Sequence, residues 1–161
     1  MKIFLRGEKG AGKTTLIGKV LEKLSYRPGG FTTRKISKSE VIFRNLISGR
    51  EFTFSVNEDP GLIAAKFNDL GVEALVEAVE YSDIIVMDEL GDLESAAGMF
   101  RMAVMNVVET FSPVLGSLKT DRKNFFHDHF QSARGITIFD ITPQNRGTLP
   151  AEIIRMYEKC I

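Results

Sequence analysis

The sequence predicts an α/β fold in which a mainly parallel sheet lies between two layers of helices. Apolar runs that suit buried strands alternate along the 161 residues with segments whose apolar residues recur at helical spacing. The first run, at 3–5, leads through a glycine-rich loop into a helical segment, and a later one, at 83–88, ends in a carboxylate. Because parallel strands need crossover connections, this alternation indicates a sheet that helices cover on both faces.

The segment that follows the first helix breaks this alternation. The first helix is expected at 16–24, and a cluster of helix-breaking residues follows at 26–30. Three short segments beyond it are rich in β-branched and aromatic residues, and turn sequences separate them: 31–33, 41–43 and 52–54. We interpret them as an antiparallel β meander, inserted at residues 31–56 into a single domain of residues 1–161.

Helices and strands alternate again beyond the meander. Helices are expected at 62–67, 72–81, 95–111, 124–131 and 151–159, and strands at 83–88, 113–118 and 135–141. Val72, Leu75, Val76 and Val79 recur at helical intervals, and the methionines at 99, 102 and 105 are interpreted as core filler. Ligands of such sheets bind beyond the carboxyl ends of the strands, so we expect one site among the loops after residues 6, 88, 118 and 141.

The composition excludes several classes of protein. Lysine plus arginine and aspartate plus glutamate number 21 each, so the net charge is zero and gives no general attraction to nucleic acid or membranes. No apolar run reaches membrane-spanning length, and the chain enters its glycine-rich loop at once, so we expect no signal peptide and a cytoplasmic monomer. The single cysteine, Cys160, is expected to be passive. His127 and His129 have no companion ligand pattern and indicate no metal site.

Residues 7–14, Gly-Glu-Lys-Gly-Ala-Gly-Lys-Thr, match the phosphate-binding pattern G-x-x-x-x-G-K-[ST] at every fixed position. The glycines let successive backbone N–H groups face one concavity, toward which the positive end of the next helix points. Lys13 would contact the β- and γ-phosphates, and the Thr14 hydroxyl would bind Mg²⁺. The alternative is a strand-to-helix turn with incidental glycines, but the flanking strand and helix favour nucleotide binding. The candidate nucleotide-binding residues here are Gly7, Glu8, Lys9, Gly10, Ala11, Gly12, Lys13, Thr14 and Thr15.

The pair Asp88-Glu89 indicates what happens to the bound nucleotide. An apolar strand that ends in an aspartate places this carboxylate near the magnesium ion, as a Walker-B residue does. The adjacent Glu89 could orient or deprotonate an attacking water molecule, which is the task of a general base. The alternative is a strand end followed by a solvated acidic turn. Downstream of a complete phosphate-binding loop, we favour the catalytic interpretation.

Four motifs occur in a fixed order over nearly the whole chain. They are the phosphate-binding loop, Gly30-Phe31-x-Thr33, Asp88-Glu89-Leu90-Gly91-x-Leu93-Glu94 and Thr142-Pro143-x-Asn145-Arg146-x-x-Leu149-Pro150. In these motifs the chain resembles the THEP-type P-loop nucleoside triphosphatases, the cancer-related nucleoside-triphosphatase family. The resemblance implies slow, Mg²⁺-dependent hydrolysis of ATP, GTP and other nucleoside triphosphates to diphosphate and phosphate. It also implies a three-layer P-loop NTPase fold related to RecA-type ATPases and nucleotide kinases.

The resemblance assigns roles to individual residues. Lys13 acts on the phosphates and in catalysis, Thr14 and Asp88 associate with the metal, and Glu89 activates water. Asn145 and Arg146 follow the last strand, where P-loop kinase relatives contact the base. From the sequence alone these two residues could equally form a turn before a helix.

Three positions depart from the pattern of the family. Asp92 stands where a lysine is common, Arg34-Lys35 where acidic residues are usual, and Lys119 where a histidine is common. These departures leave nucleotide binding intact but weaken any inference about the physiological substrate. The source of positive charge for the transition state is also open. The candidates are Arg101, Arg122, Arg134 and Arg146, of which Arg122, followed by Lys123, has the most suitable location beyond a strand end.

Two alternatives to a hydrolase remain. A nucleotide or small-molecule kinase fits the size and the loop, but the chain lacks an arginine-rich lid, and Asp88-Glu89 suits water as the nucleophile. A nucleotide-switched module that binds RNA or protein would use the basic residues of the meander, between 34 and 50.

Overall fold

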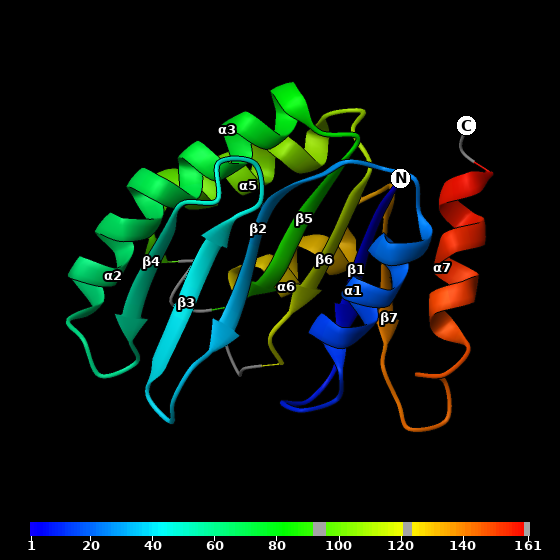
Figure 1. The fold of residues 1–161 in the computed structure, drawn as a ribbon, viewed down its shortest axis with the longest axis horizontal. Coiled ribbons are helices and arrows are strands. Elements are labelled where there is room, and N and C mark those ends of the chain that lie inside the picture. The colour runs from blue at the N-terminus through cyan, green and yellow to red at the C-terminus, as the bar shows by residue number, and fades with distance from the viewer. Residues whose placement is uncertain (92–95, 121–123, 160–161) are drawn as a thin grey trace.

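The computed structural model describes residues 1–91, 96–120 and 124–159. Asp92, Arg122, Lys123 and Cys160 therefore lie outside the described residues, as do the expectations attached to them. A seven-stranded sheet runs through the molecule in the order β4-β3-β2-β5-β6-β1-β7 (Figure 1). The strands are β1 (Lys2–Arg6), β2 (Pro28–Lys35), β3 (Glu40–Asn45), β4 (Glu51–Ser55), β5 (Ile84–Leu90), β6 (Val114–Leu118) and β7 (Ile136–Asp140).

The sheet is mainly parallel, as predicted. Strand β1 pairs in parallel with β6 and β7, and β5 pairs in parallel with β6 and β2. Strand β3 runs antiparallel to both β2 and β4, which confirms the antiparallel pairing expected within the meander. Because β2 also pairs with β5, the meander continues the central sheet and is not a separate layer.

Helices cover both faces of the sheet. The helices are α1 (Lys13–Lys23), α2 (Pro60–Lys66), the π-helix η1 (Phe67–Gly71), α3 (Val72–Tyr81), α5 (Gly98–Glu109), α6 (Phe125–Ser132) and α7 (Leu149–Glu158). Helices α1 and α7 lie on one face, and the others lie on the opposite face (Figure 1). None of the described helices combines the length and apolarity that a membrane-spanning segment requires.

The predicted helices exist, with shifted ends. The segment expected at 62–67 begins at Pro60, because the Asp59 carboxylate caps it by accepting from the backbone N–H groups of Gly61 and Leu62. It then continues through η1 into α3 without a loop. The helix expected at 95–111 is described from Gly98 to Glu109 and ends where Thr110 becomes extended.

The strands of the sheet divide the core into two clusters by side-chain alternation. On β1, Phe4 points to the face covered by α3, α5 and α6, whereas Ile3 and Leu5 pack toward α1 and α7. Phenylalanines dominate the first cluster, where Phe67 contacts the rings of Phe43, Phe52, Phe54 and Phe100 at centroid distances of 5.2–5.5 Å. Both clusters are fully buried at the central strands, so the loops at the strand ends have a rigid support.

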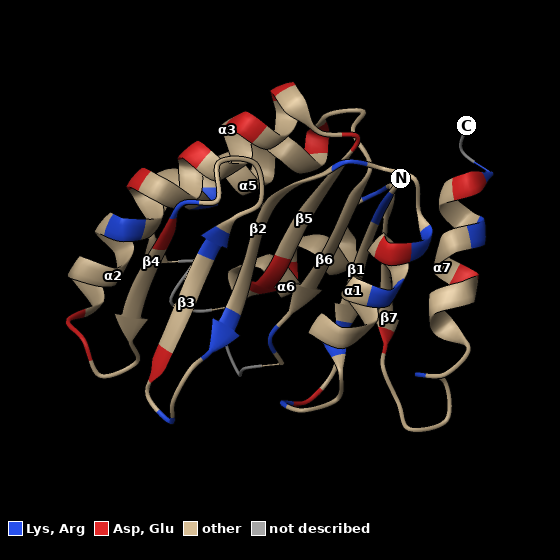
Figure 2. Ribbon diagram, in the orientation of Figure 1, with Lys and Arg blue, Asp and Glu red and all other residues tan. Residues whose placement is uncertain are grey.

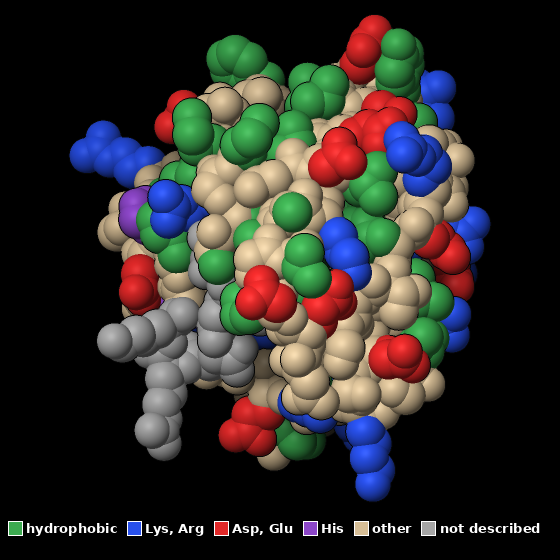
Figure 3. Space-filling view, turned by 90° about the vertical axis from the view of Figure 1, so that its left-hand side faces the viewer, with side chains coloured by type: hydrophobic (Ala, Val, Ile, Leu, Met, Phe, Trp, Pro, Cys, Tyr) green, Lys and Arg blue, Asp and Glu red, His purple; other side chains and the backbone are tan. Residues whose placement is uncertain are grey.

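The methionines show that one core prediction is wrong. Met99 and Met102 are 63% and 64% exposed, and only Met105 packs partly against the core. Met99 and Met102, together with the exposed Val76, line an apolar groove of about 460 Å³ between α3 and α5. Hydrophobic side chains gather on this part of the surface (Figure 3).

The exposure of Val76 and Val79 on α3 follows from the packing of this helix against β2. Ala74 and Ala78 are fully buried there, and a Cβ on Gly29 would lie 3.0 Å from Ala78 Cα. The helix and the strand can approach this closely because the residues between them are small. The larger Val76 and Val79 of the predicted apolar stripe therefore turn toward solvent.

Candidate nucleotide-binding and catalytic site

The loop between β1 and α1 has the geometry that an anion requires. Gly10 and Gly12 have φ of +83° and +96°, a region that glycine enters without strain. Gly12 caps α1 without a side-chain hydrogen bond, and no acidic residue occupies the first turn of the helix. No side chain therefore neutralises the positive end of α1, which points at the place where a phosphate would lie.

Lys13 folds back across this loop. Its Nζ donates hydrogen bonds to the backbone oxygens of Gly7, at 2.6 Å, and Glu8, at 3.2 Å. These bonds hold the ammonium beside the concave side of the loop before any ligand binds. A phosphate group that entered the loop would therefore meet a positive charge that is already in position.

Asp88 lies on β5, and its side chain is completely buried. Burial raises the pKa of its carboxyl, and hydrogen bonding from Ser117 and Thr14 opposes this rise. The Ser117 hydroxyl donates to Oδ1 at 2.7 Å, whereas Oδ2 has no hydrogen-bond donor among the described residues. Asp88 and Thr14 line the same cavity. An oxygen pair of this kind suits Mg²⁺, which prefers a few carboxylate or hydroxyl contacts and retains several water molecules.

Glu89 has an unusual backbone conformation. It is the one non-glycine residue with positive φ, at 77°, among the described residues, and it lies where the β5–β6 register is irregular. A backbone of this kind costs free energy and is held by its surroundings. Here the Glu89 N–H donates to Ser117 Oγ at 2.8 Å, and Thr33 Oγ1 donates to Glu89 Oε2 at 3.1 Å. The irregularity directs the carboxylate into the cavity that Lys13 and Thr14 line.

Thr33 and Ser117 are the residues to which the sequence assigned no role. Each is a buried hydroxyl on a strand next to β5, and Ser117 contacts both members of the acidic pair. The available signal was a polar residue within an otherwise apolar strand, which for Ser117 is the run 113–118. The partners of such a hydroxyl depend on the strand order.

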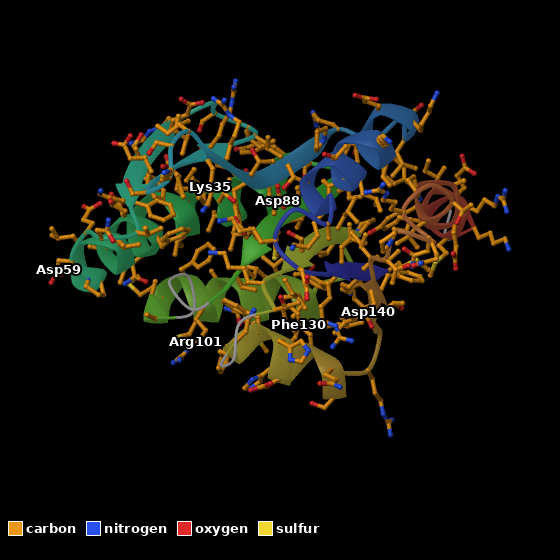
Figure 4. All side chains as sticks on the ribbon, turned by 90° about the horizontal axis from the view of Figure 1, so that it is seen from below. Lys35, Asp59, Asp88, Arg101, Phe130 and Asp140 are labelled. Atoms are coloured by element: carbon orange, nitrogen blue, oxygen red, sulfur yellow. The ribbon has the colours of Figure 1, made fainter. Side chains whose placement is uncertain are left out.

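Cavities border the loop on several sides. The phosphate cavity, about 290 Å³, lies between the loop and the acidic pair. The Arg146 cavity, about 580 Å³, lies between the loop and residues 140–143. The lysine cavity, about 440 Å³, lies on the side of the meander and is lined by Lys9, Lys35 and Lys119. Seen from the carboxyl ends of the parallel strands, Asp88 is near the middle, with Lys35 on one side and Asp140 on the other (Figure 4).

Asn145 and Arg146 lie in the loop after β7. The Asn145 side chain donates to the Asp140 backbone oxygen at 2.8 Å and accepts from the Thr142 N–H at 2.8 Å, so it holds the loop closed. Arg146 lines the cavity that residues 7–11 also line. Both residues therefore lie near the predicted nucleotide site, and contact with the base stays a prediction for each.

The other predicted candidates lie elsewhere. The Arg101 guanidinium lies 4.7 Å from the centre of the Phe125 ring, on the helical layer. His127 Nε2 is 2.7 Å from Arg6, and His129 packs on Phe125. Within the described ranges, no group of three or more histidine, cysteine, aspartate or glutamate side chains could hold a metal ion.

Comparison with known proteins identifies the family. The model of the NTPase family matches residues 2–154. Nucleoside-triphosphatase THEP1 of Methanocaldococcus jannaschii is 32% identical, over 96% of this chain and 95% of that protein. This chain belongs to the THEP-type NTPase family. THEP1 of Thermotoga maritima is 30% identical, over 96% of this chain and 94% of that protein.

Solved structures agree with this assignment of the fold. The crystal structure of THEP1 from Aquifex aeolicus superposes with a TM-score of 0.84 at 24% identity, over 97% of this chain and 98% of that one. The solution structure of a human cancer-related nucleoside triphosphatase superposes with a TM-score of 0.76 at 22% identity, over 98% of this chain and 97% of that one. The THEP-type chain described here therefore has the P-loop NTPase fold that the sequence predicts.

Proposed function

We propose that this protein hydrolyses nucleoside triphosphates, ATP and GTP among them, to diphosphate and phosphate with Mg²⁺, and that Glu89 activates the water. The observation that carries the proposal is the single cavity lined by Lys13, Thr14, Asp88 and Glu89. It combines a phosphate-binding loop with a carboxylate suited to a metal and a second carboxylate held by Thr33. The relatives named as nucleoside triphosphatases, which match almost the whole chain, support the same activity.

Each residue has a task in this reaction. The loop amides and Lys13 bind the β- and γ-phosphates and fix the γ-phosphorus for attack. Thr14 and Asp88 would hold Mg²⁺, which when bound neutralises charge on the phosphate oxygens. Glu89 accepts a proton from water as the water oxygen bonds to the γ-phosphorus. The bond from the γ-phosphorus to the bridging oxygen then breaks, and the diphosphate leaves with that oxygen.

Phosphate release tests the proposal. Purified protein is incubated with ATP, GTP, CTP or UTP, each with Mg²⁺ or with EDTA. We expect release from several of the triphosphates with Mg²⁺ and none with EDTA. Phosphate transfer to an added nucleoside monophosphate, with no release in its absence, would instead identify a kinase. Absence of both release and transfer would refute an enzymatic role.

A further inference from the structure

The proposed hydrolysis of a nucleoside triphosphate does not require the lysine cavity. The triphosphate chain fits the phosphate cavity, and the Arg146 cavity offers room for a nucleoside on the side of residues 140–146. The lysine cavity lies on the other side of the loop, toward β3 and β4, and is about 440 Å³. It adjoins the predicted position of the γ-phosphate, since Gly7, Lys13 and Glu89 also line it.

The walls of this cavity are of two kinds. Lys9 of the loop, Lys35 at the end of β2 and Lys119 after β6 bring positive charge to it from three separate segments, in addition to Lys13 and Arg34. Val41, Phe54 and Val56 form an apolar wall. Basic residues occur along the same edge of the sheet, at the carboxyl ends of its parallel strands, with acidic residues among them (Figure 2). The cavity thus presents positive charge and apolar surface together.

The ammonium groups oppose one another in the absence of an anion. Contact with Lys9 lowers the pKa of Lys35, Glu89 has a smaller opposite effect, and Lys119 lowers this pKa least. Adjacent like charges favour a bound anion, which removes their repulsion and forms charge-assisted hydrogen bonds. A single γ-phosphate would leave the apolar wall uncovered.

We propose that the lysine cavity is a second binding site, which takes a small organic anion with an apolar body while the nucleoside triphosphate occupies the loop. The anionic group contacts Lys35, Lys9 and Lys119, and the apolar body lies on Val41, Phe54 and Val56. The inference rests on the proposed function for the position of the triphosphate. It makes this protein a two-ligand enzyme, in which the second ligand lies beside Glu89.

Calorimetry with phenyl phosphate tests the second site. The loop is first saturated with Mg²⁺ and a non-hydrolysable ATP analogue, so that the probe cannot occupy it. We expect phenyl phosphate to bind one-to-one, more tightly than inorganic phosphate and more tightly than the neutral benzyl alcohol. If the ATP analogue abolishes binding of phenyl phosphate, the lysines belong to the triphosphate site and the proposal is refuted.

Two matched variants locate the binding. Lys35→Gln is expected to weaken phenyl phosphate binding by about tenfold, as the loss of one charged hydrogen bond implies. Lys38→Gln removes the same charge from the exposed turn between β2 and β3 and is expected to bind the probe as the wild type does. Equal effects of the two substitutions would mean that the anion responds to overall charge, which contradicts a defined site.

The second site and the hydrolysis can each be refuted without the other. Triphosphate hydrolysis by the wild type without binding of phenyl phosphate would overturn only the second site. Binding of phenyl phosphate together with an absence of hydrolysis would overturn only the reaction.

Discussion

The Thr33 hydroxyl donates a hydrogen bond to the Glu89 carboxylate at 3.1 Å and also reaches the Asp88 backbone oxygen at 3.3 Å. Residues 56 positions apart in the chain are thereby joined across neighbouring strands. Because Glu89 has a backbone conformation that L-residues rarely adopt, this bond helps to aim its carboxylate toward the phosphate cavity. Thr33 is therefore a positioning residue for the proposed general base.

Replacing Thr33 tests this role. Thr33→Val keeps the shape and removes the donor, so we expect kcat for phosphate release to fall about tenfold, in line with one lost hydrogen bond to a charged group. KM should change little, since the loop is untouched. Thr33→Ser restores the hydroxyl and should recover most of kcat. Equal kcat for the Val and Ser variants would contradict a positioning role.

Gly30 sets how closely β2 approaches β5, and thus whether Thr33 reaches Glu89. A Cβ at this residue would lie 2.2 Å from the Val86 backbone oxygen, and φ is +89°. We expect Gly30→Ala to destabilise the fold by about 2–4 kcal/mol, measured by urea unfolding. Gly18→Ala is the control, because a Cβ there meets no atom within 4 Å and alanine favours the helix by about 1 kcal/mol. A Gly30→Ala variant as stable as Gly18→Ala would contradict this packing.

The Asp88 carboxylate should lower the free energy of unfolding in the absence of a metal. Its folded-state pKa is raised above the ordinary 3.8, chiefly by burial, so the folded state holds its proton more tightly than the unfolded state. Stability is therefore lost as pH rises from about the ordinary pKa through the folded value. We expect Asp88→Asn to unfold at higher urea concentration than the wild type at pH 7 without Mg²⁺, and the gain to shrink toward pH 4. A gain that grows on acidification would contradict the sign of this pKa shift.

Lys13 should determine the affinity for the nucleoside triphosphate. Its ammonium is held at the loop by the Gly7 and Glu8 oxygens and faces the predicted phosphates. Lys13→Ala is expected to weaken binding of a fluorescent ATP analogue by at least about tenfold, as loss of a charge-assisted contact implies. Lys19→Ala, on an exposed position of the same helix, serves as the control. Equal affinities of the two variants would refute the role of Lys13.

The sequence predicted the parts of the site that are local. The glycine loop and Asp88-Glu89 are contiguous motifs, so residue types alone locate each segment and predict a role for it. The contacts of Thr33 and Ser117 depend on the order β2-β5-β6, which local periodicity does not contain. The same limit explains the methionines, since Met99 and Met102 have helical spacing but lie on the exposed side of α5, whose buried residues are Phe100, Val104 and Val107. Which side of a helix is buried is decided by its neighbours in the fold.

The most direct measurement is the single turnover of Mg²⁺-ATP by Glu89→Gln. The amide keeps the shape of the side chain but cannot accept the proton of water, so phosphate release should fall by about two to four orders of magnitude. Affinity for a non-hydrolysable ATP analogue should stay within about twofold of the wild type. Glu152→Gln, an exposed glutamate of α7, is the control and should react normally. Phosphate release by Glu89→Gln at the wild-type rate would contradict Glu89 as the residue that activates water.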